Sequence, residues 1–425
     1  MRIIDRPTCA EWNALCRRQG VDYEGIRPRV EAILREVEAE GDAALKRLMK
    51  EIDGVEAPLE VTAAEVSEAA EAVPQAVRDA ILAAKKNIEA FHKAQMPQEI
   101  RIETAPGVTC IQRPVAINRV GLYIPGGSAP LFSTVLMLAV PAALAGCRER
   151  VLCTPCRRDG TIAPEVLFAA CECGITRVFR IGGAQAIAAM AFGTESVPKV
   201  DKIFGPGNPY VTLAKQMVSG RSTAIDMPAG PSEVMVLADI GANPAFVAAD
   251  LLSQAEHGKD STAVLACTDR SFAQKVLQEV DNQKKALPRD VQVDGALEHS
   301  FAVVLPGRQD LIDFAEAYAP EHLIIATEDA IGIADRITAA GSVFIGPWSP
   351  ESAGDYASGT NHTLPTSGWA RSCSGVNMDS FFRKMTLQEI SREGLASLAP
   401  TIVNMAAAEG LDAHARAVTI RIEGK

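Results

Sequence analysis

Paired polar residues in the second half of the chain are the first sign of chemistry. Gln254 and His257 lie three residues apart, a spacing that puts both side chains on one face of a helix. They can ligate one metal ion, although such a pair is also common as a surface hydrogen bond. Glu321 and His322 follow Pro320 at the start of an apolar run, where either can serve as an acid or a base or form a plain surface pair. As neighbours at a strand entrance, they are expected to point to opposite sides.

A long polar segment, residues 346–366, carries two more residues of this kind, Asp355 and His362. Loops of this length inside a compact domain are usually functional, and both side chains are zinc-compatible. An ordinary surface loop is the alternative interpretation.

Near the C-terminus, Glu409 and His414 stand on either side of Gly410, which is a helix C-cap signal. We therefore expect them at the end of one helix and the start of the next turn. Four of the six histidines fall in these polar motifs, beside Asp355 and Gln254. Such a set can build a zinc site of oxygen and nitrogen ligands with room for a substrate.

Glycine-rich turns and cysteine pairs in the middle third are weaker signals. The turn GPGNPY, residues 205–210, is nearest to a dinucleotide fingerprint, but Tyr210 stands at the third glycine position. Nucleotide binding and simple strand-to-helix turns both remain open. Cys153 and Cys156 imitate a zinc motif with Cys171 and Cys173. Because Cys153 ends an expected strand and Cys171 lies in an expected helix, we expect ordinary thiols.

These residues must be positioned by an α/β fold. Residues 23–91 repeat apolar side chains at helical spacing, and His92 is expected on a helix surface. From residue 119 onward, short apolar runs end in glycine turns that open helical patterns, and a second such series follows residue 233. We expect two doubly wound (Rossmann-like) parallel-sheet domains, with the ligand cleft at the carboxyl ends of the strands. After about Phe381 the chain is expected to be helical.

Composition excludes several classes of protein. The 425 residues contain 42 Lys and Arg against 53 Asp and Glu, a net charge of −11 that disfavours nucleic acid as a partner. The most apolar stretch, residues 131–146, is too short to span a bilayer and is expected to form a buried helix. An acidic residue at position 5 and scattered cysteines favour a cytoplasmic location with reduced thiols.

Eight motifs together resemble one known family, histidinol dehydrogenase, over close to the full length of the chain. They are GLYIPGGSAPLFSTVLMLAVPA, RIGGAQAIAAMAFGT, IFGPGN, DMPAGPSEV, LLSQAEHG, YAPEHL, GDYASGTNHTLPT and AAAEGLDAH. The resemblance implies an NAD-linked zinc enzyme that oxidises L-histidinol to L-histidinal and then to L-histidine. These are the last two steps of histidine biosynthesis.

The matched positions imply a role for each site residue. They also imply a homodimer with shared active sites. Zinc is held by Gln254, His257, Asp355 and His414, with His414 supplied by the other subunit. The remaining matched residues are the catalytic pair Glu321 and His322, the substrate-binding residues Ser232, His362 and Glu409 beside His322 and the zinc ligands, and the NAD contacts Tyr123, Gln185 and Asn208.

The same resemblance organises the chain into four parts. We expect an N-terminal segment (1–22) packing with the C-terminal region, a discontinuous zinc and catalytic domain (23–118 and 234–376), an NAD-binding domain (119–233) and a helical tail (377–425) reaching the partner subunit.

The catalytic hypothesis divides the work between two residues. His322 removes the hydroxyl proton, and Glu321 activates the water that hydrates the aldehyde. One rival is a sister enzyme that oxidises another hydroxyl, such as a sulfonated diol, but the imidazole-recognition residues His362, Glu409 and His414 are present. The other rival is a non-catalytic zinc- or metabolite-binding protein, which has no need of a paired acid and base.

Overall fold

The computed structural model describes residues 1–18, 22–126, 129–175, 177–221, 223–228 and 230–424. The chain divides into two units, each built from two stretches of sequence. Unit 1 comprises Met1–Ala94 and Asn118–Asn377, and unit 2 comprises Gln95–Ile117 and Met378–Lys425.

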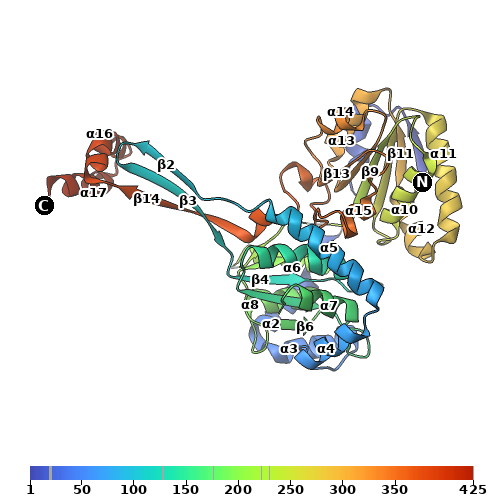
Figure 1. Ribbon diagram of the computed structural model, residues 1–425, viewed down its shortest axis with the longest axis horizontal. Coiled ribbons are helices and arrows are strands. Elements are labelled where there is room, and N and C mark those ends of the chain that lie inside the picture. The colour runs from blue at the N-terminus through green and yellow to red at the C-terminus, as the bar shows by residue number, and fades with distance from the viewer. Residues whose placement is uncertain (19–21, 127–128, 176, 222, 229, 425) are drawn as a thin grey trace. The chain divides into compact units, whose positions relative to one another are not determined.

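Unit 1 contains a parallel sheet of six strands in the order β1-β11-β10-β9-β12-β13 (Figure 1). Every residue of β9 is buried, as expected of a parallel sheet that helices cover on both faces. The strands are β1 (Arg2–Asp5), β9 (Glu233–Ala238), β10 (Thr262–Cys267), β11 (Phe301–Val304), β12 (His322–Ala326) and β13 (Ser342–Ile345).

Helices cover both faces of this sheet, on opposite sides in Figure 1. One face packs against α10 (Pro244–Ala255), α11 (Arg270–Gln283) and α12 (Asp290–His299), and the other against α1 (Cys9–Leu15), α13 (Arg308–Tyr318) and α14 (Ala330–Ala334). Shorter elements of the same region are η2 (Lys284–Ala286), α15 (Glu351–Tyr356) and η3 (Trp369–Arg371).

A second parallel sheet in unit 1 has the order β6-β5-β4-β7-β8. Its strands are β4 (Arg119–Tyr123), β5 (Glu149–Thr154), β6 (Arg177–Arg180), β7 (Lys202–Phe204) and β8 (Ala224–Ile225). One group of helices consists of α2 (Tyr23–Glu40), α3 (Asp42–Leu48), α8 (Gly183–Phe192) and α9 (Pro209–Ser219), with the π-helical turn η1 (Met49–Asp53). Another consists of α4 (Ala63–Ala72), α5 (Gln75–Lys93), α6 (Phe132–Leu144) and α7 (Pro164–Glu172). Both predicted doubly wound sheets are therefore confirmed.

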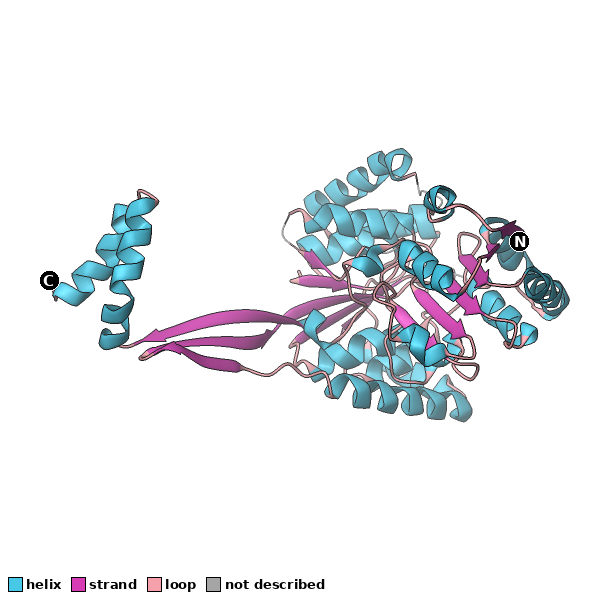
Figure 2. Cartoon of the chain, turned by 90° about the horizontal axis from the view of Figure 1, so that it is seen from above, coloured by secondary structure: helices cyan, strands magenta, loops and turns pink. Residues whose placement is uncertain are grey.

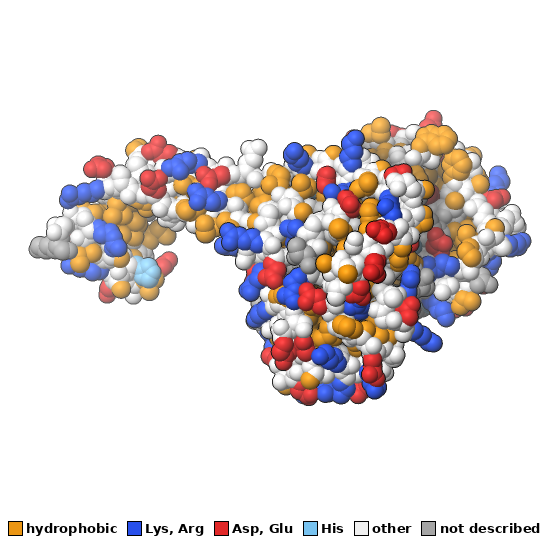
Figure 3. Space-filling view, turned by 60° about the horizontal axis from the view of Figure 1, so that its bottom comes forward, with side chains coloured by type: hydrophobic (Ala, Val, Ile, Leu, Met, Phe, Trp, Pro, Cys, Tyr) orange, Lys and Arg blue, Asp and Glu red, His pale blue; other side chains and the backbone are white. Residues whose placement is uncertain are grey.

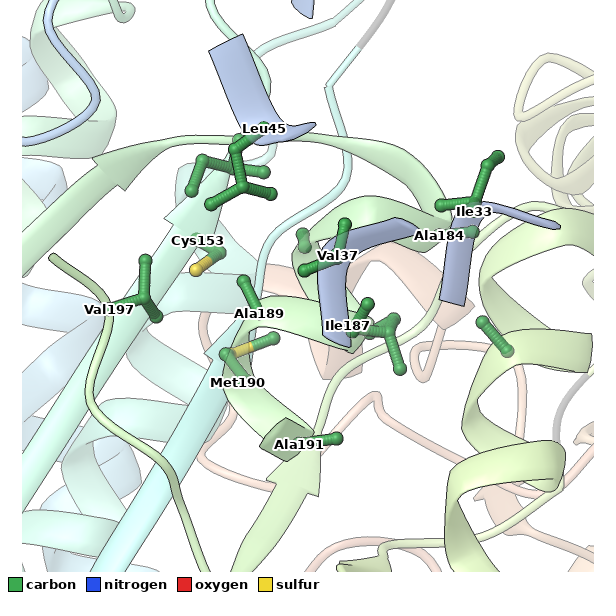
Figure 4. Close-up of a cluster of buried hydrophobic side chains, with 14 of the residues drawn as sticks. Ile33, Val37, Leu45, Cys153, Ala184, Ile187, Ala189, Met190, Ala191 and Val197 are labelled. Atoms are coloured by element: carbon green, nitrogen blue, oxygen red, sulfur yellow. The ribbon is translucent and has the colours of Figure 1, made fainter. Parts of the chain in front are cut away.

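The core beneath this sheet depends on the alanine-rich helix α8. Ile33 and Val37 of α2 pack with Ile187 and Met190 of α8 (Figure 4). All four are at most 3% exposed, and burying one such side chain contributes about 1.5–3 kcal/mol. The predicted buried helix at residues 131–146 is confirmed as α6.

Gly205, just after β7, stands where there is no room for a side chain. Its φ is +124°, and a Cβ atom there would lie 2.0 Å from the carbonyl oxygen of Tyr123. Gly54 also has a positive φ, +69°, but a Cβ atom there meets nothing within 4 Å. Gly205→Ala is therefore expected to lower the free energy of unfolding by about 1–3 kcal/mol more than Gly54→Ala does. Denaturant titration of both variants measures this, and equal losses would show that the close approach does not matter.

Unit 2 is an antiparallel sheet with a helical hairpin. Figure 2 shows its long strands side by side. Their order is β14-β3-β2. The elements are β2 (Ile100–Ala105), β3 (Val108–Ala116), η4 (Met378–Phe381), β14 (Phe382–Ile390), α16 (Arg392–Ala408) and α17 (Asp412–Glu423). The expectation of helix directly after Phe381 is wrong for β14, because all nine of its residues pair with β3.

No helix among the described residues combines the length and the apolar character needed to cross a membrane.

Candidate active site

A cavity of about 350 Å³ in unit 1 gathers residues from distant parts of the sequence. Its lining includes loops that follow strands of the second sheet and segments that precede strands of the first. The predicted site residues that line it are Asn208, Ser232, His257, Glu321, His322, Asp355 and His362.

The cavity meets the two sheets at different edges. Asn208 follows β7, so the second sheet contributes the carboxyl ends of its strands, as predicted. Ser232 precedes β9 and Glu321 precedes β12, so the first sheet contributes the amino ends of its strands. The expected cleft at carboxyl ends is therefore wrong for the first sheet. The reason is the path of the chain. α10 links the parallel strands β9 and β10, so it runs back along the sheet and ends at the amino edge, where Pro320 and Glu321 also lie.

Glu321 and His322 are both buried and face each other. The backbone N–H of Glu233 donates to Glu321 Oε2 at 2.9 Å, and His322 Nδ1 lies 3.4 Å from the carbonyl oxygen of Glu233. His322 Nδ1 is 3.7 Å from Glu321 Oε2. The expectation that the two side chains point to opposite sides is wrong, because Glu321 lies before the first residue of β12 and is not held in its alternation.

Burial controls the protonation of this pair. It raises the pKa of the Glu321 carboxyl well above its ordinary value, and nearby acidic groups add to the effect. It also lowers the pKa of the His322 imidazole to about 3. Burial therefore favours the neutral form of both groups, because a buried charge loses its hydration.

A group of metal-ligating atoms adjoins His322. One ligand atom each from His257, Glu351 and Asp355 lie within 4.8 Å of one another, and His257 Nε2 is 3.9 Å from Asp355 Oδ2. Gln254, in the last turn of α10, is fully buried, and neither atom of its amide has a hydrogen-bond partner among the described residues. An unpaired buried amide is costly. The donor atoms of His257, Glu351 and Asp355 therefore fit a zinc ion. Gln254 stays a predicted ligand, and its unpaired amide suits that role.

Glu351 was not among the predicted site residues. It is 1% exposed, its Oε1 lies 3.6 Å from His322 Nδ1, and neither carboxylate oxygen has a hydrogen-bond partner in the described part of the chain. It lies four residues before Asp355 on α15, so both share one helix face. That spacing within the polar segment 346–366 is the signal that could have found it.

His362 is fixed by hydrogen bonds at both ring nitrogens. Nε2 lies 3.2 Å from the hydroxyl of Thr134, and Nδ1 lies 3.0 Å from the carbonyl oxygen of Asp355. Nearby, His92 is fully buried, with Nε2 3.3 Å from the amide nitrogen of Asn361. The expectation of a surface position for His92 is wrong, because the segment around Asn361 packs over this face of α5.

A larger cavity of about 840 Å³ lies beside the carboxyl ends of the second sheet and is lined by Tyr123, Gln185 and Asn208. Asn208 caps α9 by accepting a hydrogen bond from Val211 N–H at 3.1 Å, and the hydroxyl of Tyr123 accepts one from Gly183 N–H at 3.1 Å. Two helix N-termini therefore face this region, an arrangement that favours phosphate groups. The three residues predicted to contact NAD thus line one cavity.

The last two predicted site residues belong to unit 2. Glu409 is the C-cap residue of α16, and His414 lies in the first turn of α17. Gly410 between them has a φ of +71°, as expected at a helix end. Both side chains are exposed.

A family model described as histidinol dehydrogenase matches residues 16–422. The chain belongs to the histidinol dehydrogenase family. The predicted resemblance is thus confirmed. Curated histidinol dehydrogenases are similar over nearly the whole length: that of Bacteroides fragilis is 53% identical over 100% of this chain and 99% of its own, and that of Escherichia coli K12 is 54% identical over 99% and 97%. A crystal structure of histidinol dehydrogenase from Elizabethkingia anophelis is 48% identical, covers 100% of this chain and 98% of its own, and gives a TM-score of 0.97.

Proposed function

We propose that this protein oxidises L-histidinol to L-histidinal and then to L-histidine, reducing two NAD in turn, as the final steps of histidine biosynthesis. The observation that carries the proposal is the convergence of Glu321 and His322 with candidate metal ligands in one cavity of a full-length member of the family. The ten cysteines, all unpaired thiols, fit the cytoplasmic location that we include in the proposal.

Zinc and NAD occupy separate parts of the proposed site. Gln254, His257 and Asp355 hold the metal together with the partner subunit's His414. A bound zinc ion orients the imidazole and amino nitrogens of the substrate, and bound NAD supplies the hydride acceptor for both oxidations. Tyr123, Gln185 and Asn208 contact NAD in the larger cavity.

Proton transfer is assigned to the buried pair. His322 takes the hydroxyl proton in the alcohol step, and Glu321 activates the water that hydrates the aldehyde. Ser232 and His362, which line the same cavity, and Glu409 bind the substrate. The burial of Glu321 and His322 keeps bulk water away from the aldehyde.

A homodimer with shared sites is part of the proposal. Large apolar side chains are exposed on the surface of unit 2, part of which Figure 3 shows, among them Ile100, Ile102, Ile390, Met405 and Leu411. A small unit with so much exposed apolar surface is expected to pack against a partner. The site is incomplete without this contact, because it takes His414 and Glu409 from the partner subunit.

Subunit mixing tests the shared site. We expect His257→Ala and His414→Ala dimers to be inactive alone and to regain about a quarter of wild-type activity after random exchange of subunits, because half the dimers are mixed and each holds one intact site. The matched control mixes His257→Ala with Asp355→Ala, where both sites of every mixed dimer stay defective. Recovery in that control, or none in the first mixture, would contradict the shared site.

Counting NADH formed per L-histidinol consumed tests the reaction, before and after chelation and return of zinc. We expect two NADH per substrate, loss of turnover on chelation and recovery with zinc. One NADH would mean that the second oxidation is missing. No NADH would favour another alcohol as substrate, or the binding-protein alternative.

A further inference from the structure

A partly buried arginine near the N-terminus, Arg18, lies behind the catalytic pair. Arg18 donates to both carboxylate oxygens of Glu233, from Nε at 2.8 Å and from Nη2 at 2.9 Å. Residue 233 is 215 positions away in the sequence. The Arg18 side chain is 15% exposed and that of Glu233 is 2% exposed. The carboxylate of this pair is therefore shielded from water, and the guanidinium is mostly shielded.

The backbone of Glu233 contacts Glu321 directly. Its N–H donates the only hydrogen bond that the described residues give to the Glu321 carboxyl, at 2.9 Å. Glu233 opens β9 beside β12, and Ser367 N–H donates to its Oε1 at 3.1 Å. Whatever fixes Glu233 therefore fixes the donor that orients the Glu321 carboxyl.

Arg18 also holds the segment that leads into Glu321. Its Nη2 donates to the carbonyl oxygen of Tyr318 at 2.7 Å and to that of Ala319 at 3.5 Å. The guanidinium lies 3.6 Å from the centre of the Tyr318 ring. Ala319 has a φ of +50°, a conformation that a non-glycine residue adopts only where its surroundings hold it. One side chain thus constrains Glu321 from two directions.

Stability alone is a weak reason for this arrangement. A buried ion pair is often replaceable by apolar side chains without loss of stability, because burying both charges costs hydration. The planar guanidinium instead fixes the positions of its partners, since it bonds several acceptors in fixed directions. Neither Arg18 nor Glu233 is among the described residues that line the 350 Å³ cavity, so both act from behind it.

We propose that Arg18 is a positioning residue for the second oxidation: through Glu233 and the backbone at Tyr318 and Ala319, it holds the Glu321 carboxyl where aldehyde hydration needs it. This inference rests on the role proposed for Glu321. It requires no contact between Arg18 and substrate or cofactor.

Arg18→Met is expected to lower kcat for histidinal oxidation by about 10- to 100-fold, because a displacement near 1 Å can cost that much. Glu233 also lies against His322, but that contact is longer, 3.4 Å from its carbonyl oxygen to Nδ1 against 2.9 Å from its N–H to Glu321. Histidinol oxidation to the aldehyde should therefore fall less, about threefold or below, and the KM for histidinal should stay within about twofold. The ratio of the two rates is independent of the fraction of folded enzyme, so a purely structural defect leaves it unchanged. Arg18→Lys should recover part of the ratio and serves as the test if the methionine variant does not fold.

Arg177 offers a matched control. It bonds both oxygens of Glu60 at 2.8 and 2.9 Å and the carbonyl oxygen of Ser196 at 2.7 Å, and lies 5.0 Å from the Phe179 ring centre. Arg177→Met therefore removes a similar set of contacts away from the cavity, and its rate ratio should equal that of wild type.

A double-mutant cycle with Glu321→Gln completes the experiment. Once the carboxyl is gone, Arg18→Met should slow histidinal oxidation by no more than about threefold further. If the losses of the two single variants multiply in the double variant, the positioning role is wrong. It is also wrong if Arg18→Met leaves the ratio of the two rates unchanged. If Glu321→Gln itself slows both oxidations equally, the role proposed for Glu321 fails and the inference fails with it. A selective Glu321→Gln beside a non-selective Arg18→Met rejects the inference alone.

Discussion

Glu321→Gln is expected to slow histidinal oxidation by about 10²- to 10⁴-fold and to leave histidinol oxidation within a few fold of wild type. A glutamine keeps the size of the side chain, and its carbonyl oxygen can still accept the Glu233 N–H, which donates to Glu321 at 2.9 Å. It cannot take a proton from water. The loss therefore reports base chemistry rather than a changed shape.

The two half-reactions are measured separately, by single-turnover NADH formation from histidinol and from histidinal. His322→Gln is the companion variant, and it should slow the alcohol step by at least as much, because no other side chain is proposed to take the hydroxyl proton. Equal losses in both half-reactions for Glu321→Gln would reject the division of work between the two residues.

Asp355→Ala is expected to lose bound zinc and to lower turnover by at least about 100-fold, since an unoriented substrate forfeits much of its effective concentration. Asp355 is central to the candidate metal group: its Oδ1 lies 3.8 Å from His322 Nε2 and its Oδ2 lies 3.9 Å from His257 Nε2. Removing the carboxylate takes away the group that lies close to both histidines.

Zinc per chain, determined by elemental analysis after dialysis, is compared with turnover. Added zinc should restore the chelated wild type but not Asp355→Ala. Asp313→Ala is a suitable control, because this carboxylate lies on α13, where it accepts a hydrogen bond from Gln309 at 2.7 Å, and it is not part of the metal group. An Asp355→Ala protein with full zinc content and full turnover would remove Asp355 from the site.

The parallel sheets were predictable because their signal is local. Strands such as β9 and β10 are buried on both faces and therefore read as unbroken apolar runs, and glycine turns mark where each helix begins. The strands at the margins lack this signal. β1 is four residues long and pairs with β11, which lies far from it in the sequence. β14 exposes most of its residues, and Arg383 and Lys384 are adjacent, so it lacks the alternation of a strand and only its pairing with β3 makes it one.

Site residues that stand in a recognisable sequence motif were predictable. Those placed by contacts between distant parts of the chain were not. His257, His322, Asp355 and His362 stand in distinctive motifs and line one cavity. The burial of His92 depends on Asn361, 269 positions away. Similarly, nothing in the sequence near Arg18 indicates that its partners are Glu233 and the residues before Glu321.

Unit 2 is built from two stretches that are far apart in the sequence, and they are therefore synthesised at different times. β2 and β3 emerge from the ribosome early, but β14, which covers the other edge of β3, belongs to the last part of the chain. Arg101 and Glu389, which bond across this sheet, are 288 positions apart. At about 5–20 residues per second, the hairpin waits roughly 15–60 s with an open edge, and a two-stranded hairpin is only marginally stable. Nascent chains that stall before residue 382 would expose that edge, and an unpaired strand edge is a template for pairing with another chain.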